Sequence, residues 1–201
     1  GDDSGLVLPP KVAPVQVVVV PVAQHKPGVL EKAHELEQRL KGRFRVKMDD
    51  SDQTPGWKFA QYEMKGVPLR LEIGPKDIAK DQCVLVRRPD RAKLPTPLDG
   101  LEDAVAEQLD QVRRILYDRA LKRREDMTYD AHTLDEMKEI ADTRPGFVRA
   151  MWCGDPACEA KIKEVAGLSS RCIPFEQEHI ADTCVCCGRP AKELVYWGKA
   201  Y

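Results

Sequence analysis

The stretch Pro14-Val15-Gln16-Val17-Val18-Val19-Val20-Pro21-Val22 decides how the first half of this chain folds. β-Branched residues run through it almost without interruption, as in a strand that is buried on both faces. Such strands lie in sheets that helices cover, so the segment predicts an α/β fold. The run is interrupted by Gln16 and too short to cross a bilayer, so it predicts no membrane span.

Helical and strand patterns alternate on the C-terminal side of this stretch. The sequence predicts strands over residues 15–22, 44–48, 68–73 and 82–86, and helices over 29–41, 57–65 and 98 to about 124. Gly42 is placed to end the first helix, and Thr54-Pro55 can cap the second. We therefore expect a sheet covered by helices, with parallel pairing at its centre.

A smaller unit is expected after about residue 126. Its predicted elements are helices over 133–142 and 159–165 and strands over 147–152, 171–174 and 193–197. A unit of about 75 residues has a marginal core, for which a structural metal is a common remedy.

Four cysteines in two close pairs predict such a metal. Cys153 and Cys158 lie in one pair, and Cys184 and Cys187 lie in the other. Four thiolates at this spacing can surround one tetrahedral Zn²⁺ in a closed, structural site. The alternatives are disulfides of a secreted domain or unpaired core thiols. The seven cysteines are an odd number and no signal peptide is evident, so disulfides are the poorer explanation.

The other candidate ligands and cysteines carry weaker expectations. Cys186 adds a thiol inside the second pair, which leaves the ligand choice there open, and His179 is a minor competitor. Cys83 and Cys172 fall inside predicted strands and are expected to be buried apolar residues.

Composition limits the partners. With 42% hydrophobic and 32% charged residues the chain has enough apolar material for a core and is not a disordered charged tail. The net charge of −1 attracts no polyanion, so a nucleic-acid surface would have to be local. Residues 56–93 provide one candidate, with nine Lys/Arg against five Asp/Glu.

Two segments carry a resemblance to a known family. They are GDDSGLVLPPKVAPVQVVVV, residues 1–20, and TPGWKFAQYEMKGVPLRLEIGPKDIAKDQCVLVRR, residues 54–88. Both resemble the anticodon-binding region of class II aminoacyl-tRNA synthetases, and prolyl-tRNA synthetases of the archaeal/eukaryotic-like type in particular. The cysteine-rich tail, with RCIPFE at 171–176, is similar to the extra C-terminal domain of that type.

The resemblance implies a fold and a division of the chain. Residues 1–13 would end a catalytic domain or link to it, 14–126 would be the anticodon-binding domain, and 127–201 the zinc-binding domain. The expected fold is α/β, with a mixed, largely parallel five-stranded sheet flanked by helices, followed by a small α+β zinc-binding domain.

The resemblance also implies a reading site at Glu63, Arg70 and Lys76. Arg and Lys can donate to guanine O6 and N7, and a carboxylate can accept from the N1–H and N2–H₂ edge. From residue types alone, Glu63 and Arg70 could equally form a surface ion pair of little energetic value. The aromatic residues of 57–62 could stack on bases, although their helical spacing favours the core.

Whole members of the family activate proline with ATP and Mg²⁺ and load it onto tRNA(Pro). The resemblance therefore implies partners and a place: the tRNA(Pro) anticodon stem-loop, the protein's own catalytic domain, a second copy in a homodimer, and the cytoplasm. It also implies that the carboxylate of Tyr201 lies near the active site of the full enzyme. The motifs that grip ATP are not found here, so this segment alone should not form prolyl-adenylate.

Two other functions remain open from the sequence. One is a free-standing zinc-containing RNA-binding module related to synthetases. The other is a thiol-redox enzyme, which would rest only on Cys184, Cys186 and Cys187.

Overall fold

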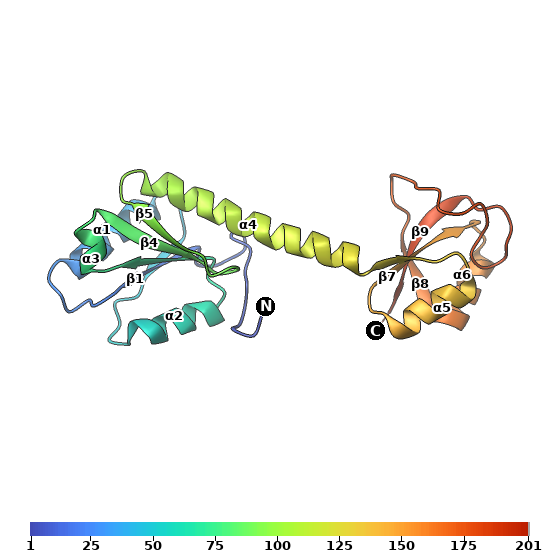
Figure 1. The fold of residues 1–201 in the computed structure, drawn as a ribbon, viewed down its shortest axis with the longest axis horizontal. Coiled ribbons are helices and arrows are strands. Elements are labelled where there is room, and N and C mark those ends of the chain that lie inside the picture. The colour runs from blue at the N-terminus through green and yellow to red at the C-terminus, as the bar shows by residue number, and fades with distance from the viewer. Residues whose placement is uncertain (201) are drawn as a thin grey trace. The chain divides into compact units, whose positions relative to one another are not determined.

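The chain forms two compact units, Gly1–Arg119 and Ala120–Tyr201, and the computed structural model describes residues 1–200 (Figure 1). Elements that begin in the first unit are β1 (Val17–Pro21), α1 (Val29–Lys41), β2 (Val46–Met48), α2 (Pro55–Met64), β3 (Leu69–Ile73), α3 (Pro75–Ile78), β4 (Gln82–Arg87), β5 (Lys93–Pro97) and α4 (Leu101–Asp126). Those of the second are β6 (Thr128–Asp130), α5 (Leu134–Thr143), β7 (Phe147–Trp152), α6 (Pro156–Ala166), β8 (Leu168–Cys172) and β9 (Glu193–Lys199).

The first unit contains the expected mixed five-stranded sheet, in the order β2-β1-β3-β4-β5. β1 pairs in parallel with both β2 and β3, whereas β4 is antiparallel to both β3 and β5. Parallel pairing is thus confined to one half of the sheet, so the sheet is mixed as expected but not largely parallel. The physical reason is the length of the connections: the segments between β3 and β4 and between β4 and β5 are too short for a crossover.

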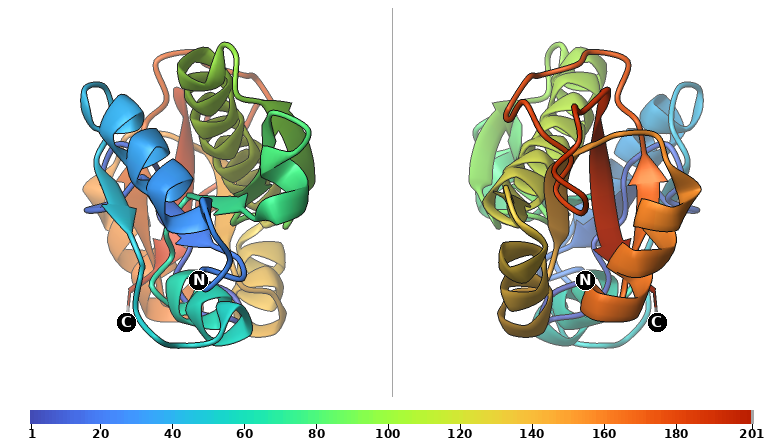
Figure 2. Two further views of the ribbon diagram at one scale, coloured as in Figure 1. Left: turned by 90° about the vertical axis from the view of Figure 1, so that its left-hand side faces the viewer. Right: turned by 90° about the vertical axis from the view of Figure 1, so that its right-hand side faces the viewer.

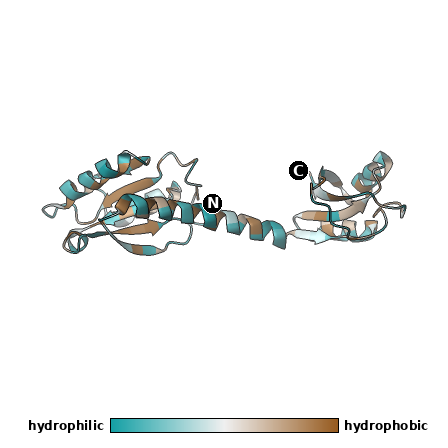
Figure 3. Ribbon diagram, turned by 90° about the horizontal axis from the view of Figure 1, so that it is seen from above, coloured by the Kyte–Doolittle hydropathy of each residue, from teal (hydrophilic) through white to brown (hydrophobic). Residues whose placement is uncertain are grey.

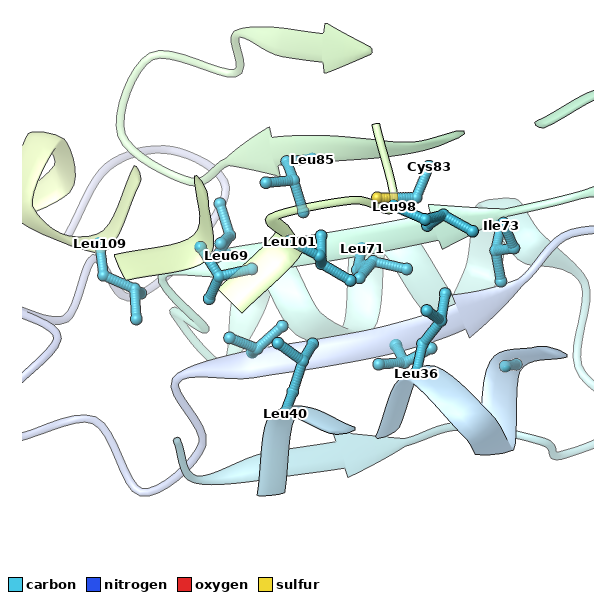
Figure 4. Close-up of a cluster of buried hydrophobic side chains, with 14 residues drawn as sticks. Leu36, Leu40, Leu69, Leu71, Ile73, Cys83, Leu85, Leu98, Leu101 and Leu109 are labelled. Atoms are coloured by element: carbon cyan, nitrogen blue, oxygen red, sulfur yellow. The ribbon is translucent and has the colours of Figure 1, made fainter. Parts of the chain in front are cut away.

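Both faces of β1 are buried, as its sequence predicts. Val17 and Val19 pack with leucines of α1, β3 and α4 in the larger cluster (Figure 4). Val18 and Val20 point to the other face and pack with Tyr62 of α2. Helices α1 and α4 therefore cover one face of the sheet and α2 the other, as the left view of Figure 2 also shows.

The three helices predicted for the first unit are present, with shifted ends for two of them: α2 covers Pro55–Met64 where residues 57–65 were expected, and α4 covers Leu101–Asp126 where 98 to about 124 was expected. The hydroxyl of Thr54 accepts a hydrogen bond from the backbone N–H of Trp57 and so caps α2, and Gly42 follows the last residue of α1. Two elements, α3 and β5, have no counterpart in the strands and helices read from the sequence. β5 contains two prolines, which make its sequence unlike that of a strand. The prolines are tolerated because β5 lies at the edge of the sheet.

The second unit is a four-stranded sheet in the order β6-β7-β9-β8, with β6 parallel to β7 and the other pairs antiparallel. Apolar residues of α5 and α6 pack against the face that carries Val148, Ala150 and Trp197. In Figure 3 the strands of this unit mix brown with paler segments, as in a sheet that is buried on one face only.

One prediction about the second unit is wrong. Cys172 is exposed, because β8 lies at the edge of its sheet and its pairing with β9 is irregular between Ser170 and Cys172. The strand also begins earlier than expected, at Leu168. By contrast, Cys83 is fully buried in the first unit, as predicted. No helix of the described residues is long and apolar enough to cross a membrane.

Candidate functional sites

The side chain of Arg70 lies in the sheet of the first unit and is only 8% exposed. Its Nη1 donates to Oε1 of Glu63 at 3.2 Å and its Nε to Oε1 of Glu72 at 2.9 Å. The ring of Phe59 lies 4.0 Å from the guanidinium carbon. Two carboxylates and a π face thus surround one buried cation, which excludes the interpretation of Glu63 and Arg70 as a simple surface ion pair.

The elements explain why these groups meet. Arg70 is on β3 and points to the face that α2 covers, and Glu63 belongs to the last turn of α2. Glu72 follows Arg70 by two residues, so both point to the same face of the strand. Because Arg70 holds Oε1 of Glu63 and leaves Oε2 without a hydrogen bond among the described residues, that oxygen can accept from a ligand.

Lys76 lies apart from this cluster. It is exposed on α3, which begins directly after the end of β3, and it makes no ion pair with any described residue. The structure therefore brings Glu63 and Arg70 together and leaves the ammonium group of Lys76 available at the end of the same strand.

The three aromatic residues of α2 have three different environments. Tyr62 is 5% exposed and belongs to the core, as its spacing predicts. Phe59 is partly buried against Arg70, and Trp57 is 48% exposed. Of the three, Trp57 has the surface to stack on a splayed base.

Sequence reasoning missed two parts of this site. Glu72 has a readable signal, since its spacing of two from Arg70 on a predicted strand places both on one face. Asp2, for which the sequence suggests no partner, forms a turn and also binds Arg88 through both carboxylate oxygens. No local pattern connects two residues so far apart in the chain.

The two cysteine pairs converge in the second unit. The Sγ atoms of Cys153, Cys158, Cys184 and Cys187 all lie within 4.8 Å of one another. Cys153 Sγ is 3.7 Å from that of Cys158 and 3.8 Å from that of Cys187. A tetrahedral site with metal–sulfur bonds of about 2.3 Å has edges of about 3.8 Å, so the group fits one metal ion.

The backbone shapes this cluster. Gly154 and Gly188 adopt φ values of 83° and 70°, a region that favours glycine, and each follows a cysteine of the cluster. The carbonyl of Cys184 accepts from the N–H of Gly188, which closes the tight turn between the second pair of ligands. Cys186 and His179 are not members of the cluster, and His179 instead contacts Asp182 at 2.7 Å.

Arg189 adds positive charge at the edge of the cluster. Its Nε donates to Sγ of Cys187 at 3.2 Å, and its Nη2 contacts Asp155. The hydrogen bond from this guanidinium lowers the pKa of the Cys187 thiol to about 6, whereas burial raises that of Cys158. A thiolate is the form that ligates a metal, so Arg189 favours the ligating state of Cys187.

Comparisons with known proteins match both units. Residues 16–108 match the family of the anticodon binding domain, and residues 134–201 match the family described as prolyl-tRNA synthetase, C-terminal. The whole chain is 63% identical to the proline–tRNA ligase of Clostridium novyi (strain NT) over 201 residues. Over its whole length the chain is similar to proline–tRNA ligases.

Two further proline–tRNA ligases show similar agreement. The chain is 60% identical to the proline–tRNA ligase of Clostridium botulinum (strain 657 / Type Ba4) and 59% identical to that of Ruminiclostridium cellulolyticum, again over 201 residues. It spans 42% of the length of each of these relatives. The expected position of Tyr201 lies outside the described residues.

The burial of Arg70 generates a stability prediction. Arg70→Ala leaves two carboxylates close together without a cation, so we expect a loss of about 2–3 kcal/mol in the free energy of unfolding, below the range for a fully buried pair. Lys76→Ala, which removes an exposed and unpaired cation, should change it by less than about 0.5 kcal/mol. Chemical denaturation of both variants measures the difference, and equal stability would contradict a structural role for Arg70.

Proposed function

We propose that this chain is the tRNA-reading, structure-supporting C-terminal part of an enzyme that activates proline with ATP and attaches it to tRNA(Pro). The observation that carries the proposal is the Glu63–Arg70 pair, in which a buried cation orients a carboxylate that keeps one oxygen available. A carboxylate in that state suits the Watson–Crick edge of guanine, which presents two N–H donors.

Each proposed reading residue has its own role. Glu63 accepts from guanine N1–H and N2–H₂, and Lys76, exposed at the end of β3, donates to a base or phosphate oxygen. The Nε and Nη1 atoms of Arg70 donate to carboxylates, so its main role is to hold Glu63 in position. The remaining N–H groups of its guanidinium can donate to a base. The target is the anticodon stem-loop of tRNA(Pro), whose anticodon carries two guanines.

The proposed metal is a structural Zn²⁺ held by Cys153, Cys158, Cys184 and Cys187. Four sulfur ligands at tetrahedral edge distances favour zinc, and a full ligand set leaves no position for a water. When bound, the ion would join the strand end at Cys153, the start of α6 and the loop before β9.

The remaining proposals concern the whole protein. ATP and Mg²⁺ would bind in the catalytic domain, which would also be a partner of this chain, and two full-length copies would form a homodimer in the cytoplasm. Similarity to proline–tRNA ligases at 59–63% identity supports these proposals. The alternative is a free-standing zinc-containing RNA-binding module related to synthetases, with the same anticodon and metal sites.

Removing the lysine tests the RNA-reading proposal. Lys76→Ala should weaken binding of a synthetic stem-loop with a UGG anticodon by about fivefold or more, because one base or phosphate contact is lost. Lys80→Ala, which removes an exposed lysine four residues away, is the matched control. Fluorescence anisotropy at fixed salt measures both affinities. Equal weakening in the two variants would indicate a general charge effect and contradict a specific role for Lys76.

Metal analysis tests the zinc site. The purified chain should contain one zinc per molecule, and Cys158→Ser should lose it because three thiolates no longer complete the tetrahedron. Cys186→Ser removes the neighbouring thiol outside the cluster and should keep the metal. Zinc retained in Cys158→Ser, or lost in Cys186→Ser, would overturn the ligand assignment.

Deletion of Tyr201 tests the proposed link to the active site. In the full-length enzyme we expect the truncation to slow proline-dependent pyrophosphate exchange, because a terminal carboxylate is a strong acceptor that would help to order the catalytic domain. Zinc content and stem-loop affinity should not change. Wild-type exchange kinetics in the truncated enzyme would rule out this role.

A further inference from the structure

The segment of residues 1–6, here called the strap, is docked on the end of α2. A turn closes between Asp2 and Gly5, with backbone hydrogen bonds of 2.9 Å in both directions. The N–H of Leu6 then donates to the carbonyl of Met64 at 3.0 Å. The strap therefore contacts the residue next to Glu63 through its backbone.

Two glycines allow this close approach. A Cβ on Gly5 would lie 2.5 Å from Cα of Met64, and a Cβ on Gly66 would lie 2.7 Å from Cβ of Leu6. Both glycines also have positive φ values, 125° and 70°. The sequence thus has glycine at the position on each side where a side chain would push the strap away from α2.

Arg88 joins the strap to the reading site. Its side chain is 1% exposed. Its Nη1 and Nη2 contact the two carboxylate oxygens of Asp2 at 2.8 and 2.6 Å. Its Nε donates to the backbone carbonyl of Glu63 at 2.9 Å. This carbonyl belongs to the last turn of α2, where helical carbonyls need partners and a cation is favourable. Arg88 thus anchors the backbone of Glu63, as Arg70 anchors its carboxylate.

The packing leaves little freedom between these groups. The cavity lined by Glu63, Arg70 and Arg88 has a volume of about 10 Å³, which is room for about one water molecule. A displacement of Arg88 would therefore move the last turn of α2.

We propose that Asp2 and Arg88 are positioning residues of the anticodon site: the strap orients Arg88, and Arg88 sets the position from which Glu63 reads a guanine. The inference rests on the proposed RNA-reading function and adds two residues to it. It makes guanine discrimination depend on a segment that contains none of the three proposed reading residues. By linkage, guanine binding in turn stabilises the docked strap.

Paired substitutions in the 201-residue chain test this inference. Asp2→Asn weakens the grip on Arg88, and Gly5→Ala displaces the strap without changing any charge. The control is Asp3→Asn. Asp3 is an exposed neighbouring residue whose carboxylate has no hydrogen-bond partner among the described residues. The readout is the ratio of affinities for a UGG stem-loop and for the same stem-loop with both guanines replaced by adenine, together with the melting temperature.

We expect both strap variants to reduce the ratio by about fivefold, the lower end of what one base contact provides, and Asp3→Asn to leave it unchanged. An unchanged ratio in both strap variants, or an equal loss of affinity for both stem-loops, would overturn the inference. If the wild-type chain itself prefers neither stem-loop, the proposed function fails instead, so the two failures are distinguishable.

Discussion

Burial of β1 on both faces is the constraint on which the arrangement of the first unit depends. Its four valines are fully buried, and each contributes about 1.5–3 kcal/mol on burial. That desolvation requires a helix on each side and a paired strand at each edge. The right-handed crossovers through α1 and α2 meet both requirements, and the second crossover places α2 over the face that carries Arg70.

The same arrangement imposes an electrostatic cost. Arg70 occupies a sheet position beneath a helix, where an unpaired guanidinium would be strongly unfavourable. Glu63, Glu72 and Phe59 offset that cost, so the groups proposed to read RNA also keep the face stable. Arg88 is a second buried arginine beside the same cavity, with Asp2 as its counter-ion. Arg70 binds the carboxylate of Glu63 and Arg88 binds its backbone carbonyl, which preorganises the proposed reader before a base arrives.

The parts of the structure with local periodic signals could be predicted from the sequence. The β-branched run gave β1, Thr54-Pro55 gave the start of α2, and the spacing of four cysteines gave a cluster that the structure brings together. β5 could not be found from the sequence, because its prolines mask an edge strand. The exposure of Cys172 was missed because a local pattern does not show that a strand lies at the edge of a sheet. The partnership of Asp2 with Arg88 depends on tertiary packing alone.

Hydrogen–deuterium exchange of the chain, with and without a UGG stem-loop, tests the central claim most directly, namely that RNA is read at the face formed by α2, β3 and α3. We expect slower exchange at the end of α2 and at residues 69–78, no change over residues 134–200, and no such protection from a stem-loop without the two guanines. Protection confined to the second unit, or equal protection by both stem-loops, would contradict it.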